Sequence, residues 1–238
     1  MIKAIRDRLT YAATFWKREV RNGGVRLSLR EASLRMRFAL LTGYELEDAR
    51  LARAVLRPED RVLELGSSIG FVALYCQLVL GIRDFAMVEA NPRLLPLIHE
   101  NFRLNGASPP PLYNLAAGPE DGTASFTINR DFWSSSTIER ANGREQVTVP
   151  QRSIPSIVAE LPFRPNTLII DIEGGEAAIP IAHWLAFDTI IGEFHERLVG
   201  SAAIRGITDS LIAAGYAEIA RDGCSRAFRR EAAGTVDR

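Results

Sequence analysis

Acidic side chains and one histidine follow two apolar segments in the second half of this chain, where they could act on a proton. Asp171 and Glu173 follow the apolar run 167–170, and Glu193 and His195 follow the next such run. If both runs are strands, residues two apart project to the same face, and the ends of parallel strands meet where ligands bind. Histidine titrates near neutral pH, and Glu173 or Glu193 could orient the imidazole. We therefore predict that these four residues are catalytic, with His195 as the base that deprotonates a hydroxyl.

A glycine turn in the first half of the chain is typical of a nucleoside-binding site. The run E-L-G-S-S-I-G occupies residues 64–70, between an apolar strand and an apolar helix. Gly66 lets the backbone turn sharply and approach a ligand because it has no Cβ, and the helix start would present unpaired N–H groups. Glu89 ends the next strand, where an acid can accept hydrogen bonds from both hydroxyls of a ribose. These features predict nucleoside binding, although the glycines could also serve only strand–helix packing.

The spacing of this turn favours S-adenosylmethionine over a dinucleotide. In the G-x-G-x-x-G fingerprint the second glycine admits a pyrophosphate, but the second and third positions here are Ser68 and Phe71. Glu64 suits a cofactor with a cationic end, and S-adenosylmethionine carries an ammonium and a sulfonium but no phosphate. We expect Glu64 and its turn to hold the methionine end, Glu89 the ribose, and the segment 114–117 the adenine.

The composition fits one enzyme domain in a reducing compartment. Of the 238 residues, 47% are hydrophobic, which is enough for a substantial core. Lys and Arg together number 29, as do Asp and Glu, so the charge balance gives no case for nucleic acid as a partner. Cys76 and Cys224 do not have the spacing of a metal motif and indicate reduced thiols. We therefore expect a cytoplasmic location.

Strands and helices alternate after residue 45, as in a mainly parallel sheet covered by helices on both faces. The predicted strands are 61–65, 84–89, 112–116, 166–171, 187–194 and 216–221. The predicted helices are 45–56, 69–80, 92–105, 175–185 and 201–214. Two further strands, 122–129 and 144–150, flank a polar loop at 130–143. We expect the segment 130–145 and the first forty residues to determine the choice of substrate.

The N-terminal segment has the pattern of a basic amphipathic helix within residues 1–20. Such a helix could lie on a membrane surface, or it could pack on its own domain through Ile2, Ile5, Leu9 and Phe15. No apolar run in the sequence is long enough to cross a membrane. We divide the chain into an N-terminal helical extension, a catalytic domain and a flexible tail, at 1–43, 44–230 and 231–238.

Taken together, these motifs resemble the FkbM family of S-adenosylmethionine-dependent methyltransferases. The similarity covers about residues 40–195 and rests on D-x-E-G-x-E at 171–176, E-x-H at 193–195, E-L-G-x-x-x-G at 64–70, Glu89-Ala-Asn-Pro, Tyr44-Glu45 and Trp133-Ser-Ser-Ser136. Glu64 departs from the family, in which aspartate is commoner. The resemblance implies a Rossmann-like class I methyltransferase fold, with a mostly parallel central sheet between helices. It also implies O-methylation of a hydroxyl on a small molecule, sugar, glycolipid or secondary metabolite.

The resemblance extends the cofactor site and leaves several alternatives open. The expected cofactor-binding residues are Tyr44, Glu45, Glu64, Gly66, Ser67, Ser68, Gly70, Glu89, Ala90, Asn91, Ala116 and Asp171. In place of a histidine base, Asp171, Glu173 and His195 could bind a magnesium or manganese ion that lowers the pKa of the hydroxyl. A nucleoside-binding scaffold without catalysis has little use for the strand-end acids, and Ser68 disfavours a nicotinamide-dependent oxidoreductase.

Overall fold

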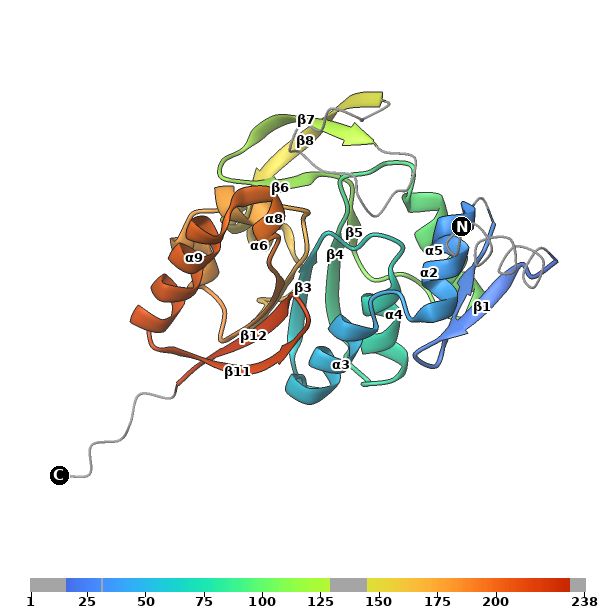
Figure 1. Cartoon of the computed structure of the whole chain (residues 1–238), viewed down its shortest axis with the longest axis horizontal. Helices are drawn as coiled ribbons and strands as arrows, with labels where there is room; N and C mark the ends of the chain where they lie inside the picture. Colours follow the sequence, from blue (N-terminus) through green and yellow to red (C-terminus); the bar gives the residue numbers. More distant parts are fainter. Residues whose placement is uncertain (1–15, 31, 129–144, 232–238) are drawn as a thin grey trace, which may run out of the picture.

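The computed structural model describes residues 16–30, 32–128 and 145–231, and its centre is a seven-stranded β-sheet (Figure 1). The strands across the sheet are β11 (Tyr216–Asp222), β12 (Ser225–Arg230), β10 (Thr189–Glu193), β9 (Thr167–Ile170), β3 (Arg61–Leu65), β4 (Asp84–Val88) and β5 (Leu112–Tyr113). Neighbours are parallel, except that β12 is antiparallel to both β10 and β11. The chain proceeds from β3 to β5 in one direction and from β9 to β10 in the other. Ligands of open α/β sheets bind at the carboxyl ends of strands at such a reversal.

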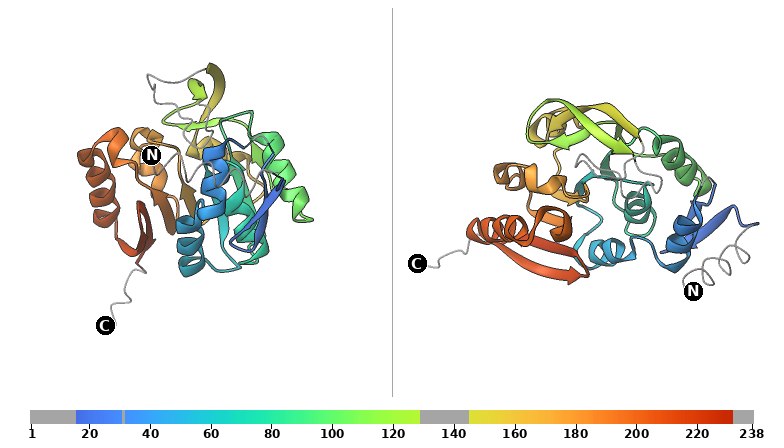
Figure 2. Two further views of the ribbon diagram at one scale, coloured as in Figure 1. Left: turned by 45° about the vertical axis from the view of Figure 1, so that its right-hand side comes forward. Right: turned by 45° about the horizontal axis from the view of Figure 1, so that its top comes forward.

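Helices cover both faces of the sheet, because the side chains of each strand alternate between the faces. In β3, Val62 belongs to one hydrophobic cluster and Leu63 to the other. The first face is covered by α3 (Leu46–Val55), α4 (Phe71–Leu78) and α5 (Leu95–Leu104). The second is covered by α6 (Ile154–Glu160), α7 (Ile181–Trp184) and α9 (Ser201–Ala213), as further views show (Figure 2). This arrangement confirms the predicted α/β architecture.

Two predicted elements are divided in the structure. The predicted helix 175–185 is a short 3-10 helix, η2 (Gly175–Ala178), followed by α7, because Pro180 disfavours helical backbone at Ile179. The predicted strand 112–116 divides into β5 and β6 (Ala116–Gly118), and β6 pairs in another sheet. Asp171 and Glu173 lie in the turn between β9 and η2 and belong to no helix or strand.

The sequence pattern did not predict β12, α6 or the short helix α8 (Glu196–Val199). Half of β12 is arginine, which made it a poor strand candidate. In the structure, Arg226 and Arg230 lie over the rings of Phe194 and Tyr216, so that their guanidinium groups contact aromatic faces at the sheet. Ser153 caps α6 by accepting a hydrogen bond from a backbone N–H, which is a signal that the sequence does contain.

The described part of the N-terminal extension is helical only in part. Before α2 (Leu34–Thr42) it forms a hairpin of β1 (Glu19–Asn22) and β2 (Val25–Ser28), so the prediction of helix as far as residue 20 is wrong there. Two asparagines hold this hairpin by hydrogen bonds, one within α5 and one at its C-terminal end. Asn101 accepts from the N–H of Ser28. Asn105 accepts from the N–H of Arg26 and donates to its carbonyl oxygen. The predicted packing residues Ile2, Ile5, Leu9 and Phe15 lie outside the described residues. No helix of the described ranges is long and apolar enough to span a membrane.

A second, three-stranded sheet of order β6-β8-β7 lies at one end of the central sheet, at the top in Figure 1. Its strands β7 (Gly122–Ile128) and β8 (Glu145–Ser153) confirm the two strands predicted around the polar loop, while the loop 130–143 lies outside the described residues. Its small core consists of Ala116, Phe126, Ile128 and Val149. Ala116 and Phe126 also line a cavity together with residues that follow β3 and β4.

Gly66 permits the contact between β3 and β9 on which this end of the sheet depends. Its φ is +89°, and a Cβ at this position would lie 1.7 Å from the carbonyl oxygen of Asp171. We therefore expect Gly66→Ala to destabilise the protein by more than the roughly 1–2 kcal/mol that left-handed backbone alone costs. Urea unfolding would measure the difference. Gly215→Ala is the matched control, since Gly215 has a φ of +84° and open space around its Cβ position. Equal losses in the two variants would contradict the proposed contact.

Candidate active site

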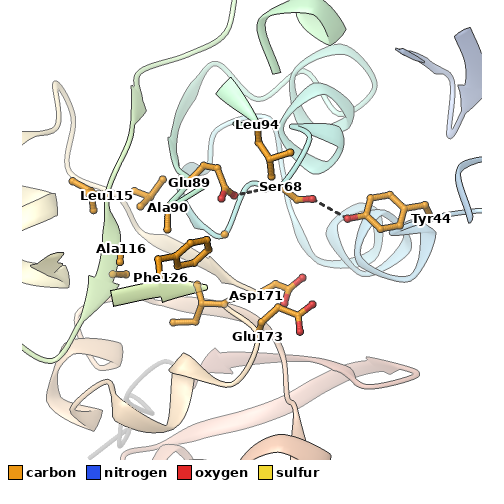
Figure 3. A pocket seen from close by; sticks show the side chains of 14 residues that line it. Tyr44, Ser68, Glu89, Ala90, Leu94, Leu115, Ala116, Phe126, Asp171 and Glu173 are labelled. Carbon is orange, nitrogen blue, oxygen red and sulfur yellow. Dashed lines mark hydrogen bonds between the residues drawn. The ribbon is translucent and has the colours of Figure 1, made fainter. Parts of the chain in front are cut away.

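A cavity opens at the carboxyl ends of β3, β4 and β9, where the order of the strands reverses (Figure 3). We call it the first cavity. Its apolar lining consists of Val88, Ala90, Leu94, Leu115, Ala116, Ala117, Phe126 and Ile172. Its remaining lining consists of Tyr44, Gly66, Ser68, Glu89, Asp171 and Glu173. An apolar wall opposite a few polar groups is the usual character of a site for a small organic ligand.

Glu89 is fixed in the first cavity by backbone hydrogen bonds. Its Oε2 accepts from the N–H of Ser68 and its Oε1 from the N–H of Asn91, both at 2.7 Å. Burial raises the pKa of Glu89 to about 7, although these hydrogen bonds lower it. Each oxygen keeps lone-pair capacity for a further donor, so the carboxyl group can still bind a diol. Asn91 itself is buried and does not line the first cavity, but its N–H holds the carboxyl group of Glu89.

The amides of the glycine turn are used within the protein. Four N–H groups have partners inside the chain: those of Gly66 and Ser67 donate to Val88, that of Ser68 to Glu89, and that of Gly70 to Ser67. The prediction that the start of the helix near Ser68 presents unpaired N–H groups to a ligand is therefore wrong for Ser68 and Gly70. Ser67 is buried and Gly70 packs against apolar side chains, so neither lines the first cavity. Ser68 does line it, and its hydroxyl is hydrogen-bonded to that of Tyr44 at 2.8 Å.

A second cavity of about 280 Å³ adjoins the first and shares Tyr44, Asp171 and Glu173 with it. Its other lining residues are Gly43, Glu45, Glu47, Asp48 and Glu193. Three of the acids come from the start of α3, and the other three from the ends of β9 and β10. No lysine or arginine belongs to this lining in the described part of the chain. The second cavity is therefore strongly acidic.

Glu64 extends this acidic region from β3. It lines a narrow space with Glu45, Asp48, Asp171 and Glu193. Glu64 is 3% exposed, and its Oε2 has no hydrogen-bond partner among the described residues. Burial raises its pKa to about 8, which the neighbouring Ser67 only partly offsets. A buried acid without a partner is stabilised by a proton or by a bound cation.

His195 lies among the carboxylates that follow β9 and end β10. Its Nε2 is 3.6 Å from Oδ1 of Asp171 and 3.8 Å from a carboxylate oxygen of Glu173 and of Glu193. The structure thus brings together the four residues that the sequence analysis selected as catalytic. Three of them, Asp171, Glu193 and His195, also offer ligand atoms within 4.8 Å of one another and could hold a metal ion; this group contains Glu193 where the expected set contains Glu173.

The acid that orients His195 is Glu176, which the sequence analysis did not select. Glu176 is fully buried, and its Oε1 lies 2.9 Å from Nδ1 of His195. It also accepts hydrogen bonds from the N–H groups of Gly174 and His195. Because two backbone N–H groups already donate to this carboxylate, we assign the hydrogen of the ring to Nδ1, which leaves Nε2 toward the other acids. The expectation that Glu173 or Glu193 orients the ring is wrong. The sequence does contain a signal for this role, because Glu176 is the last acid of the D-x-E-G-x-E run. An acid at a helix start is common for other reasons, so this signal does not stand out.

Burial and mutual repulsion set the protonation of this cluster. The pKa of Asp171 is raised by burial and then by the charge of Glu193, and burial raises the pKa of Glu193 to about 7. Burial lowers the pKa of His195, but the hydrogen bond and charge of Glu176 outweigh that effect, so its pKa is raised. Near neutral pH the cluster therefore holds protons that a bound cation would displace.

The fold of this chain has counterparts among solved structures. A crystal structure of the methyltransferase FkbM from Methylobacillus flagellatus is similar with a TM-score of 0.52 and 14% identity, over 96% of this chain and 60% of that chain. This chain has a class I methyltransferase fold. At 14% identity the similarity extends to the fold alone, and the chain spans 60% of the length of that methyltransferase.

Two other solved methyltransferases are similar at a lower level. One is a methyltransferase from Pyrococcus furiosus, with a TM-score of 0.47 and 9% identity over 95% of both chains. The other is precorrin-6y C5,15-methyltransferase from Geobacter metallireducens, with a TM-score of 0.46 and 14% identity over 79% of this chain and 87% of that chain. At these TM-scores neither adds to the assignment of the fold. No protein-family model and no curated protein sequence matches the chain.

The raised pKa values of the buried acids predict how stability changes with pH. The folded-state pKa is about 8 for Glu64 and about 7 for Glu89, so above their ordinary value of 4.5 the folded chain keeps protons that the unfolded chain loses. The free energy of unfolding should therefore fall as pH rises from about 5.5 to about 8, by at most about 1.4 kcal/mol per pH unit for each acid. Urea unfolding at stepped pH would show it. Glu64→Gln should flatten the fall, whereas Glu120→Gln, at an exposed acid, should not. Stability that rises over this range would contradict the assignment.

Proposed function

We propose that this protein is an S-adenosylmethionine-dependent methyltransferase that transfers a methyl group to a hydroxyl. The observation that carries the proposal is the continuity of the two cavities at the reversal of the sheet. The first offers an apolar wall and Glu89, as a nucleoside requires, and the second offers the acids that surround His195. The fold and the resemblance of the motifs to the FkbM family support the same function.

The residues of the two cavities fit this cofactor. Glu89 would bind the ribose hydroxyls, while Ala116 and Phe126 would enclose the adenine within the first cavity. Glu64, buried and with an oxygen that lacks a partner among the described residues, would bind the ammonium of the methionine end. When bound, S-adenosylmethionine supplies a methyl group on a positively charged sulfur. Asp171 lines both cavities and would lie where they meet.

His195 would act as the base that takes the proton of the acceptor hydroxyl. Glu176 holds Nδ1, so the neutral ring presents the lone pair of Nε2. The pKa of His195 is raised by Glu176 and the surrounding acids, and a cation bound among those acids would lower it again. A positioned base of this kind typically contributes about 10²–10⁴-fold to the rate, beyond the contribution of alignment.

The acceptor that we infer is a small molecule or a glycan hydroxyl, and not a nucleic acid. Six carboxylates around the second cavity would repel a phosphate backbone. Free Cys76 and Cys224 support a cytoplasmic location, where thiols stay reduced. We assign catalysis to residues 44–230 and regard 1–43 as an extension, of which Val25, Leu27, Leu29 and Leu40 belong to a hydrophobic cluster of the described core.

Two other functions are less well supported. A nicotinamide-dependent oxidoreductase would need turn amides for a pyrophosphate, but the amides of Gly66, Ser67 and Ser68 already have partners in the chain. A nucleoside-binding scaffold would have no use for the carboxylates around His195, and buried charge without a ligand is destabilising.

Calorimetric titration with S-adenosylmethionine, S-adenosylhomocysteine and NAD tests the cofactor. We expect the first two to bind and NAD not to bind. Glu89→Ala should weaken binding by roughly 1.5–3 kcal/mol, because it removes charge-assisted hydrogen bonds to the ribose. Glu120→Ala, at an exposed acid that lines neither cavity, should bind as the unmodified chain does. Tight binding of NAD with no response to the other two would refute the proposal.

Substitution of His195 tests the mechanism. With cell extract as the source of acceptor, His195→Ala should release S-adenosylhomocysteine about 100-fold more slowly, at unchanged cofactor affinity. Activity should rise with pH through the raised pKa of His195, since the base must be unprotonated. Glu176→Gln should move this rise to lower pH, because Glu176 raises that pKa.

A chelator distinguishes the base from a metal ion in the same assay. Activity that survives chelation supports the base. Loss of activity that magnesium restores would instead assign Asp171, Glu193 and His195 to a metal ion. Near-normal turnover of His195→Ala would remove His195 as the base.

A further inference from the structure

We infer that the acceptor is a cation, namely a molecule that carries an ammonium or guanidinium group in addition to the hydroxyl that is methylated. The inference rests on the proposed function, because it takes the second cavity as the place of the acceptor beside the cofactor. The second cavity shares Tyr44, Asp171 and Glu173 with the first, so a molecule bound there would lie next to the cofactor.

The first support is the excess of acids over bases around the second cavity. Glu45, Glu47 and Asp48 line it from the start of α3, opposite the three acids at the ends of β9 and β10. Within the described residues its lining includes no lysine or arginine. Arg50, one turn along α3, is paired with Asp222 at 2.6 Å and does not line the cavity. A neutral acceptor would leave these carboxylates facing one another.

The second support is Glu64, which is independent of the lining of the second cavity. Glu64 is 3% exposed, lacks a partner for Oε2 among the described residues, and shares its narrow space with Glu45, Asp48, Asp171 and Glu193. The methionine end of the cofactor carries an ammonium, a sulfonium and a carboxylate, so its net charge is a single positive one. That charge compensates only part of the acidic group. A further positive charge on the acceptor would compensate more of it.

The spread of the acids favours an organic cation over a metal ion. Magnesium binds oxygen ligands at about 2.0–2.1 Å, so one ion reaches only a compact group of side chains. Such an ion could be held by Asp171, Glu193 and His195 but would leave the α3 acids without a cation beside them, although Asp48 accepts a hydrogen bond from the hydroxyl of Ser225. An organic acceptor can place its hydroxyl at His195 and its ammonium, which has three N–H donors, at the acids of α3.

Two matched ligands test this inference on the full chain saturated with S-adenosylhomocysteine. Aminobutanol carries an ammonium at one end and a hydroxyl at the other, whereas butanediol carries a hydroxyl at both ends. By calorimetry or ligand-observed NMR, aminobutanol should bind at least roughly tenfold more tightly than butanediol. Glu45→Gln and Glu47→Gln should each reduce this preference, and Glu120→Gln should retain it.

The outcomes separate this inference from the proposed function. If S-adenosylhomocysteine binds but the two alcohols bind equally, or neither binds, the acceptor is not recognised as a cation and the proposed function stands. If magnesium binds to the second cavity and aminobutanol does not, the acids form a metal site and the inference is overturned. If S-adenosylhomocysteine itself fails to bind, both the inference and the proposed function are overturned. A preference for aminobutanol that Glu47→Gln abolishes supports the inference.

Discussion

The candidate site depends on the close approach of β3 and β9 at Gly66. Because residue 66 has no Cβ, the carbonyl of Asp171 fits against the turn, and the N–H of Asp171 donates to Leu65 at 2.9 Å. The pairing of β3 with β9 thus continues to the last residues of both strands. This brings Glu64 and Asp171 to the same narrow space, at the position where the order of strands reverses. A larger residue at 66 would separate the strands and, with them, the acids.

Carboxyl groups serve two different purposes in this arrangement. Glu176 is fully buried but satisfied, since three N–H groups donate to it, and it fixes the ring of His195. Glu64 and Glu193 are not satisfied in this way, and burial raises the pKa of both. An acid whose oxygens all have hydrogen-bond donors makes the site rigid. A buried acid without such donors is stabilised only by a bound proton or a bound cation. The cluster therefore combines a fixed base with a region that gains stability when a positive charge binds.

The sequence predicted the frame of the site better than its contacts. The alternation of apolar runs located β3, β9 and β10, and their final residues identified the acids around His195 because ligands bind at strand ends. The role of Glu176 was missed because it depends on a contact between an irregular turn and the end of another strand. The N–H groups at the helix start near Ser68 were expected to face a ligand, but those of Ser68 and Gly70 donate to Glu89 and Ser67. Such pairings depend on three-dimensional proximity, which hydrophobic periodicity does not encode.

The proton balance of cofactor binding tests most directly whether these acids are arranged for a cation. Calorimetry near neutral pH in buffers of different ionisation enthalpy gives the number of protons exchanged on binding. Glu64 and Glu193, with pKa values of about 8 and about 7, should lose protons when a positive charge binds beside them. S-adenosylmethionine, which carries the sulfonium, should therefore release more protons than S-adenosylhomocysteine, and Glu64→Gln should reduce the release. Equal proton release by the two ligands, or net proton uptake with S-adenosylmethionine, would contradict a cation-binding role for this cluster.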